Sequence, residues 1–165
     1  MTTKSHSSLS KTKSHAALSQ EQNLVDQLDG ALRRLMWVER SWLKQTLDEF
    51  DLDVVPFMLL MYLRKHNETC PIGELAHALG QPNATTTGHV DRLEQKGLVK
   101  REFGNQQDRR QVRVHVTTQG TALVRRVQQL RQEHLKRVLS HIDAREQRAL
   151  LQRLENYLNA FEAVK

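Results

Sequence analysis

The chain has 165 residues, a length that suits one domain or one domain with an appendage. Its single cysteine excludes an internal disulfide framework, and its longest apolar run is too short to span a membrane. With 25 Lys and Arg against 19 Asp and Glu, and a pI of about 9.8, the composition favours a polyanionic partner, with nucleic acid as the first candidate.

The first segment, residues 1–18, consists largely of Ser, Thr, Lys and His and is expected to form a flexible basic tail, with a short helix at its end as an alternative. No apolar core follows its basic residues, so we expect no secretory signal and a cytoplasmic protein. A long helix is predicted to begin near Ser19, which has capping-box spacing to Gln22. Its apolar stripe contains Leu24, Leu28, Leu32, Leu35 and Trp42.

A second helix is predicted after Asp53, a good N-cap residue, with Pro56 in its tolerant first turn. The segment "VVPFMLLMYLRKH" is apolar around most of its circumference, which indicates a buried central helix. Two short helices follow and are separated by Gly80, which permits a tight turn, and Gly97 ends the second of them. The pair is typical of a helix-turn-helix, with Thr86, Val90 and Leu93 facing inward on its second helix.

Two strands, "LVKREF" and "QVRVHV", are predicted to pair around "GNQQDRR". A fifth helix is then capped by Thr117 or Thr118, and a sixth begins at a capping box formed by Asp143 and Glu146. The predicted fold class is mainly α with a small two-stranded β-wing, a winged helix-turn-helix.

The charged hairpin tip suits DNA recognition. In a winged helix the second helix of the helix-turn-helix enters the major groove, and a basic tip reaches the adjacent minor groove, whose negative potential attracts arginine. Arg109 and Arg110 would supply that arginine, and Asp108 would hold one guanidinium in a fixed geometry. The alternative is a solvated loop with incidental ion pairs, but the place of the tip just after a helix-turn-helix favours the first interpretation.

The segment "GELAHALGQPNATTTGHVDRLEQKGLVKREFGNQQDRRQVRVHVTTQG" resembles the MarR family of winged-helix regulators over roughly residues 53–120. The family pattern of Asp-x-Arg, an alternating strand and Thr-x-x-Gly is matched by Asp108, Arg110, Thr117 and Gly120. The resemblance implies that wing arginines enter the minor groove, oriented by the aspartate. It also implies dimerisation through the first and the last two helices, and hence a homodimer on a pseudo-palindromic operator in double-stranded DNA.

The recognition helix departs from the family at Gly88, where arginine is frequent. Glycine weakens a helix by about 1 kcal/mol relative to alanine, and a close approach to DNA would be one reason to keep it. Threonine can offer a methyl group to thymine or a hydroxyl to a phosphate. The expected DNA-binding residues of this helix are Asn83, Ala84, Thr85, Thr87, Gly88, His89 and Arg92.

The resemblance further implies a repressor released by a small aromatic, phenolic or lipophilic effector. The candidate pocket residues are Met36, Trp37, Arg40, Trp42, Phe57, Met58 and Met61, although Met and aromatic residues at helical spacing are usually core. The predicted parts are a flexible tail (1–18), an N-terminal dimerisation helix (19–52), a winged-helix lobe (53–117) and C-terminal dimerisation helices (118–165).

Other functions find little support in the residues. Cys70 lacks a second cysteine to resolve a sulfenate, and His134 and His141 are too sparse for the metal sites of zinc-sensing relatives, so we expect no metal and no cofactor. No phosphate loop, nucleophile elbow or paired catalytic carboxylates are found, which argues against an enzyme. The alternative that stays open is a winged-helix module that binds DNA without sequence preference, as an architectural protein does, or binds a protein partner.

Overall fold

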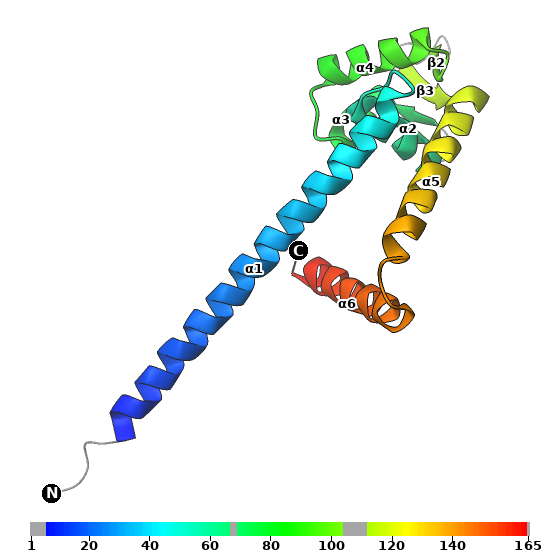
Figure 1. Ribbon diagram of the computed structural model, residues 1–165. Coiled ribbons are helices and arrows are strands. Elements are labelled where there is room, and N and C mark those ends of the chain that lie inside the picture. Colours follow the sequence, from blue (N-terminus) through cyan, green and yellow to red (C-terminus); the bar gives the residue numbers. More distant parts are fainter. Residues whose placement is uncertain (1–5, 67–68, 104–111, 165) are drawn as a thin grey trace, which may run out of the picture. The chain divides into compact units, whose positions relative to one another are not determined.

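The computed structural model describes residues 6–66, 69–103 and 112–164, with side chains from residue 20 onward. The chain divides into two compact units, one ending at Asp48 and the other starting at Glu49. A single helix, α1 (His6–Asp48), makes up the first unit, and the second contains every other helix and strand described (Figure 1). Within the described ranges, no helix combines the length and the apolar character that crossing a membrane requires.

Helix α1 begins at His6, well before the start predicted near Ser19. Residues 6–18, which were predicted to belong to a tail with a short helix at its end as an alternative, are thus helical, and Ser19 and Gln22 lie inside the helix rather than at its start. The physical reason is that no proline or glycine interrupts residues 6–19, so a helix nucleated downstream extends through them at little cost.

Helix α2 (Val54–Lys65) starts after Asp53, as predicted, although the Asp53 side chain makes no capping hydrogen bond among the described residues. Its buried residues are Pro56, Phe57, Leu59, Leu60 and Leu63, which confirms the predicted central helix. The burial is not complete around the circumference, because Met58 and Met61 are exposed.

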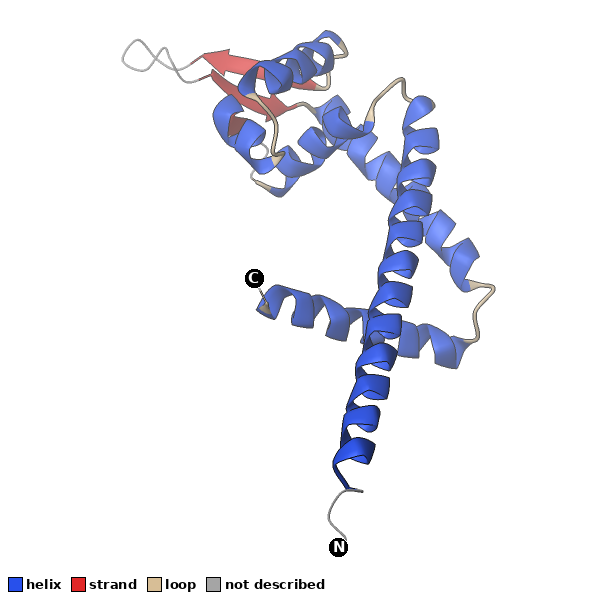
Figure 2. Cartoon of the chain, turned by 90° about the vertical axis from the view of Figure 1, so that its left-hand side faces the viewer, coloured by secondary structure: helices blue, strands red, loops and turns tan. Residues whose placement is uncertain are grey.

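The sheet has three antiparallel strands, β1 (Thr69–Pro71), β2 (Val99–Phe103) and β3 (Val112–Val116), in the order β1-β3-β2 (Figure 2). The register of the β2–β3 hairpin pairs Val99 with Val116 and Phe103 with Val112. The predicted hairpin is thus confirmed, and β1 is an addition that sequence periodicity missed because three residues are too few to show alternation. Through β1 the wing strands are joined to the segment that follows α2, which anchors the base of the wing in the lobe.

Helices α5 (Thr118–Leu139) and α6 (Ala144–Ala163) complete the second unit. The cap of α5 is Thr117 rather than Thr118, since the Thr117 side chain accepts a hydrogen bond from the amide of Gly120 at 3.0 Å. The cap of α6 is Asp143, as predicted, but its carboxylate accepts from the Arg145 amide at 2.8 Å.

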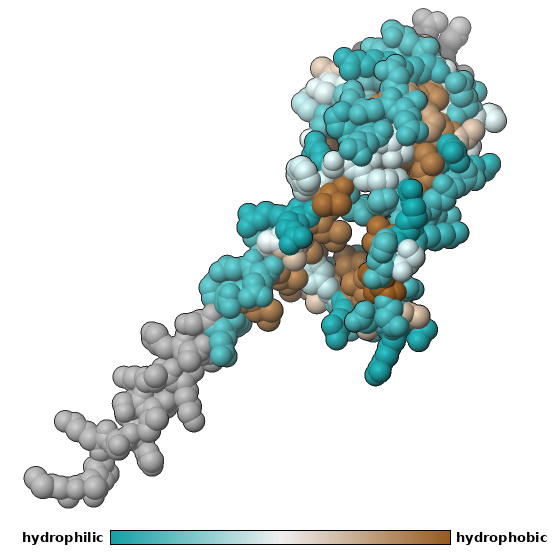
Figure 3. All heavy atoms as spheres, viewed as in Figure 1, coloured by the Kyte–Doolittle hydropathy of each residue, from teal (hydrophilic) through white to brown (hydrophobic). Residues whose placement is uncertain are grey.

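Only the first half of α5 is packed into the lobe, through Gly120, Val124 and Val127, and α6 buries no residue. Hydrophobic side chains are therefore exposed on the last part of α5 and along α6, as the face seen in Figure 3 shows for α6. They are Leu135, Val138, Leu150, Leu151, Leu154, Leu158 and Phe161.

Candidate nucleic-acid interface

The helix-turn-helix consists of α3 (Ile72–Ala78) and α4 (Asn83–Gln95), and both helices end in the same way. At the end of α3, Gly80 has φ of 59°, and the amides of Gly80 and Gln81 bond to the carbonyls of His77 and Ala76 at 3.1 and 2.9 Å. This pattern is a Schellman motif, whose left-handed residue is tolerated by glycine without a steric penalty. The predicted turn at Gly80 is confirmed.

At the end of α4, Gly97 repeats the motif with φ of 69°. The amides of Gly97 and Leu98 bond to the carbonyls of Glu94 and Leu93, both at 2.9 Å. The chain therefore leaves the recognition helix in a fixed direction and enters β2 two residues later, which places the wing next to α4. The predicted stop at Gly97 is confirmed.

One face of α4 is sealed against the lobe by Thr86, Val90 and Leu93, each fully buried, as predicted. The opposite face is presented outward, with Asn83, Ala84, Thr85 and Arg92 exposed and Thr87, Gly88 and His89 half-buried. A helix whose inner face is fixed by three small or medium side chains can offer its outer face to a groove without repacking.

Thr87 and Gly88, two of the candidate recognition residues, have different surroundings. The hydroxyl of Thr87 donates to the carbonyl of Asn83 at 2.9 Å, so it is engaged with the helix backbone. A Cβ added at Gly88 would meet no described atom within 4 Å, and the φ angle there is an ordinary helical one. The fold of the described chain therefore does not require glycine at position 88.

The end of α4 carries residues that the sequence analysis did not single out. Gln95 is exposed, and with 3.6 residues per turn it falls on the same outer face as Ala84 and Gly88. The Lys96 Nζ lies 2.5 Å from the exposed Asp51 carboxylate in the loop before α2, and this hydrogen-bonded pair lowers the pKa of Asp51. The sequence feature that could have placed Gln95 on this face is its position seven residues, about two helical turns, after Gly88.

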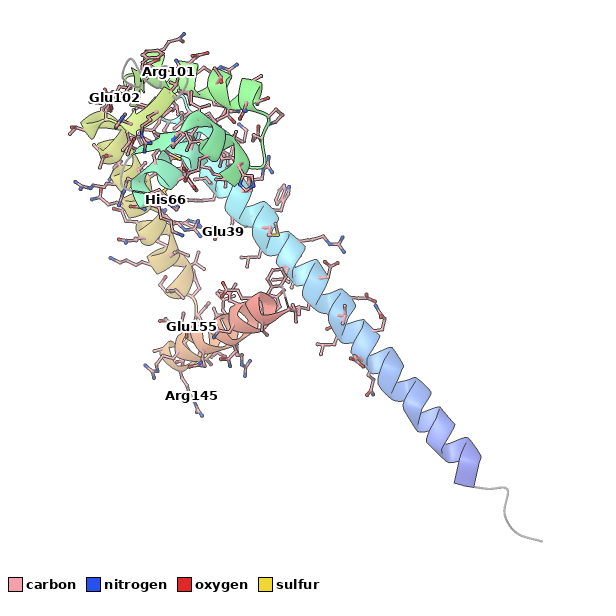
Figure 4. All side chains as sticks on the ribbon, turned by 180° about the vertical axis from the view of Figure 1, so that it is seen from behind. Glu39, His66, Arg101, Glu102, Arg145 and Glu155 are labelled. Carbon is pink, nitrogen blue, oxygen red and sulfur yellow. The ribbon has the colours of Figure 1, made fainter. Side chains whose placement is uncertain are left out.

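The wing strands carry further charged side chains. Arg101 of β2 contacts Asp91 and Glu94 of α4, and on the same hairpin His115 Nε2 lies 2.6 Å from a Glu102 carboxylate oxygen. The adjacent positions of Arg101 and Glu102 on β2 are labelled in Figure 4. The tip residues Asp108, Arg109 and Arg110 lie outside the described residues, so their expected roles stay predictions.

The start of α5 is packed directly on the strand that leads into the wing. The Thr117 hydroxyl donates to the Gly97 carbonyl at 2.7 Å, and the Thr117 amide donates to the Leu98 carbonyl at 3.0 Å. A Cβ on Gly120 would lie 2.2 Å from that Leu98 oxygen. The Thr-x-x-Gly motif therefore ties the start of α5 to Gly97 and Leu98, the two residues that precede β2.

The candidate pocket residues are divided between the two units, with Met36, Trp37, Arg40 and Trp42 on α1 and Phe57, Met58 and Met61 on α2. Met36 and Trp37 are strongly exposed, at 71% and 72%. Phe57 is only 5% exposed and belongs to the core of the lobe, so it does not line an open surface.

Cys70 does not have the environment of a reactive thiol. Burial, followed by the neighbouring Glu74 carboxylate, raises the pKa of the Cys70 thiol to about 11, which keeps it protonated and unreactive at neutral pH. No group of three or more His, Cys, Asp or Glu among the described residues is placed to hold a metal ion.

Comparison with known proteins decides the family. Residues 50–111 match the model of the MarR family. The HTH-type transcriptional regulator PecS of Dickeya dadantii (strain 3937) is 32% identical over 134 residues, which cover 78% of this chain and 80% of PecS. The chain belongs to the MarR family. It is therefore a DNA-binding transcriptional regulator and not an enzyme, as the sequence analysis expected.

Solved structures agree with this assignment at the level of the fold. A MarR family protein from Bacillus stearothermophilus is 25% identical, has a TM-score of 0.74, and the match covers 87% of this MarR-family chain and 98% of that one. A point mutant of S. aureus MepR bound to an oligodeoxyribonucleotide is 24% identical with a TM-score of 0.63, covering 80% of this chain and 96% of that one. The predicted winged helix-turn-helix is confirmed.

Proposed function

We propose that this MarR-family protein binds a pseudo-palindromic operator as a homodimer and represses transcription until a small aromatic or lipophilic effector releases it. The observation that carries the proposal is the two-sided character of α4. Its inner face is closed by fully buried Thr86, Val90 and Leu93, whereas Ala84, Thr85 and Arg92 are presented outward. A helix presented in this way fits the major groove, which is wide enough to admit it.

Gly88 lies in the middle of the proposed contact surface. It costs the helix about 1 kcal/mol relative to alanine, and the described fold makes no use of the missing Cβ. We infer that the missing side chain lets the helix backbone approach the base edges or a phosphate. Thr85 would then contribute a methyl group or a hydroxyl, and Arg92 a charge-assisted bond to a base or phosphate.

The wing would bind the neighbouring minor groove through Arg109 and Arg110, with Asp108 orienting one of them. This part of the proposal is supported by the sequence motif and by the β2–β3 register, which directs both strands toward the segment 104–111. MepR, whose fold is similar, has been solved bound to an oligodeoxyribonucleotide.

Dimerisation is supported by the exposed apolar side chains on three helices. In the second unit they lie on the end of α5 and along α6, where no residue is buried within one chain. In the first unit α1 exposes Leu24, Leu28 and Leu35 at helical spacing. Large exposed apolar surfaces of this kind are typical of subunit interfaces, and a two-fold axis would place two recognition helices about 34 Å apart.

An effector site is the least constrained part of the proposal. Its candidate residues on α1 are Met36, Trp37, Arg40 and Trp42, and those on α2 are Phe57, Met58 and Met61, of which Phe57 is buried. An effector would lower DNA affinity only if it binds the conformation that cannot bind DNA more tightly than it binds the DNA-binding conformation.

The test is selection of operator sequences from random DNA with the full chain, followed by fluorescence anisotropy with the selected duplex and a scrambled duplex. We expect a preference for the selected duplex, and a loss of about 1–3 kcal/mol of operator binding in Arg92→Ala. Arg126→Ala, which removes an exposed charge from α5, is the matched control. Equal affinity for both duplexes, with a steep salt dependence, would favour a non-specific architectural module instead. Aromatic acids and phenols are then added as competitors, and release of the operator identifies the effector class.

A further inference from the structure

Among the described residues, Arg101 makes the most hydrogen bonds and ion pairs between the wing strands and the recognition helix. Its Nη2 lies 2.5 Å from a carboxylate oxygen of Asp91, and its Nη1 donates to Glu94 at 2.7 Å. Nη2 also lies 3.3 Å from the carbonyl of Thr87, and the Arg101 backbone amide donates to the second Glu94 oxygen at 2.9 Å. Four contacts thus run from one β2 residue to three residues of α4, next to which Arg101 is labelled in Figure 4.

The three partners share one face of α4. Thr87, Asp91 and Glu94 are four and three residues apart, a spacing that places them one above the other along the helix. This face lies beside the outer face that carries Gly88 and so adjoins the proposed DNA surface. The guanidinium is bound through two of its nitrogens in a planar fork, a geometry that the single ammonium of a lysine does not reproduce.

We propose that Arg101 is a positioning residue for sequence recognition: it fixes the rotation of α4 about its own axis relative to wing strand β2, and it withdraws two helix carboxylates from the approaching phosphates. The inference rests on the proposed function and assigns a residue outside both the helix and the wing tip to operator specificity. In this role Arg101 acts through α4 rather than by contacting DNA itself.

The contact of Arg101 with α4 is better suited to positioning α4 than to stabilising the fold. The Arg101 side chain is 15% exposed, whereas Asp91 and Glu94 are 50% and 38% exposed. When Arg101 is removed, the two carboxylates can be rehydrated, so the fold loses little, as is usual for ion pairs near the surface. The freed carboxylates would then lie close to the DNA phosphates and repel them. The helix edge next to Gly88 would also lose its link to β2.

The experiment measures affinity for the selected operator and for a scrambled duplex, by anisotropy on full-length protein well below its thermal transition. Arg101→Lys keeps the charge but not the fork. Arg101→Gln removes both. The double variant Arg101→Gln with Glu94→Gln has the wild-type net charge without the fork, and Arg126→Gln controls for loss of one distant charge.

We expect Arg101→Lys to lower the ratio of operator to scrambled affinity by roughly tenfold while leaving scrambled affinity close to wild type, the size of effect that one disturbed base contact produces. The double variant should regain the affinity for the scrambled duplex that Arg101→Gln loses, but not the wild-type ratio of operator affinity to scrambled-duplex affinity. A wild-type ratio in both Arg101→Lys and the double variant overturns the positioning role, because charge alone would then explain Arg101→Gln. If the wild-type protein shows no preference for the operator, the proposed function fails, and this inference fails with it.

Discussion

Replacing Gly120 by alanine tests how closely α5 is packed on the strand that leads into the wing. The added Cβ would lie 2.2 Å from the Leu98 carbonyl oxygen and 2.8 Å from Cγ2 of Val116. Carbon atoms do not approach an oxygen so closely, so the backbone of Leu98 or the start of α5 must shift by about 1 Å. The oxygen is held in place, because it accepts hydrogen bonds from the Thr117 amide at 3.0 Å and from the Thr117 hydroxyl at 3.1 Å.

The expected cost combines opposing effects. Overpacking typically costs about 1–3 kcal/mol, and weakening two hydrogen bonds adds about 1–2 kcal/mol. The gain in helix propensity from glycine to alanine offsets about 1 kcal/mol. We therefore expect Gly120→Ala to lower the free energy of unfolding by about 1–4 kcal/mol, which for a chain of this size lowers the Tm by roughly 2–16 °C.

The assay is equilibrium urea denaturation together with thermal denaturation followed by circular dichroism. Protein concentration is held constant, because the stability of the proposed dimer would depend on it. Gly73→Ala is the matched control, since a Cβ there meets no described atom within 4 Å and its φ is not positive. A Gly120→Ala protein as stable as the wild type would refute the close packing of α5 on Leu98.

Two further predictions concern the buried thiol and the exposed face of α6. The pKa of Cys70 is raised to about 11 from its usual 9.0 by burial, so the neutral thiol stabilises the fold fully below pH 9, and this contribution is lost as the pH rises through 11. Wild-type stability should thus fall more between pH 9 and 11 than that of Cys70→Ala, and the thiol should resist alkylation at pH 8 until urea unfolds the protein; rapid alkylation of native protein would contradict this. On α6, Leu154→Glu should give monomers by analytical ultracentrifugation and weaken operator binding, whereas Asn156→Glu, on the opposite face, should not. A dimeric Leu154→Glu protein would exclude α6 from the interface.

Much of the lobe could be predicted from the sequence because its signals are local. Gly80 and Gly97 have positive φ angles, which the turn at the end of a helix requires and which glycine adopts easily. Thr86, Val90 and Leu93 repeat with the period of a buried helix face. The two threonines likewise predicted the start of α5, although only the structure distinguished Thr117 from Thr118 as the cap. Such features depend on residues a few positions apart, so the sequence contains them.

Other features depend on residues that are distant in the chain, and only the tertiary structure decided them. Strand β1 exists because Cys70 pairs with Val114, and three residues alone have no recognisable period. Gly120 is required by the Leu98 carbonyl, 22 positions earlier, and Arg101 acquires its partners because a hairpin folds back against α4. The extent of α1 was also beyond the sequence, since Ser- and Lys-rich residues are compatible with a tail or with a helix, and the residues themselves do not choose between them.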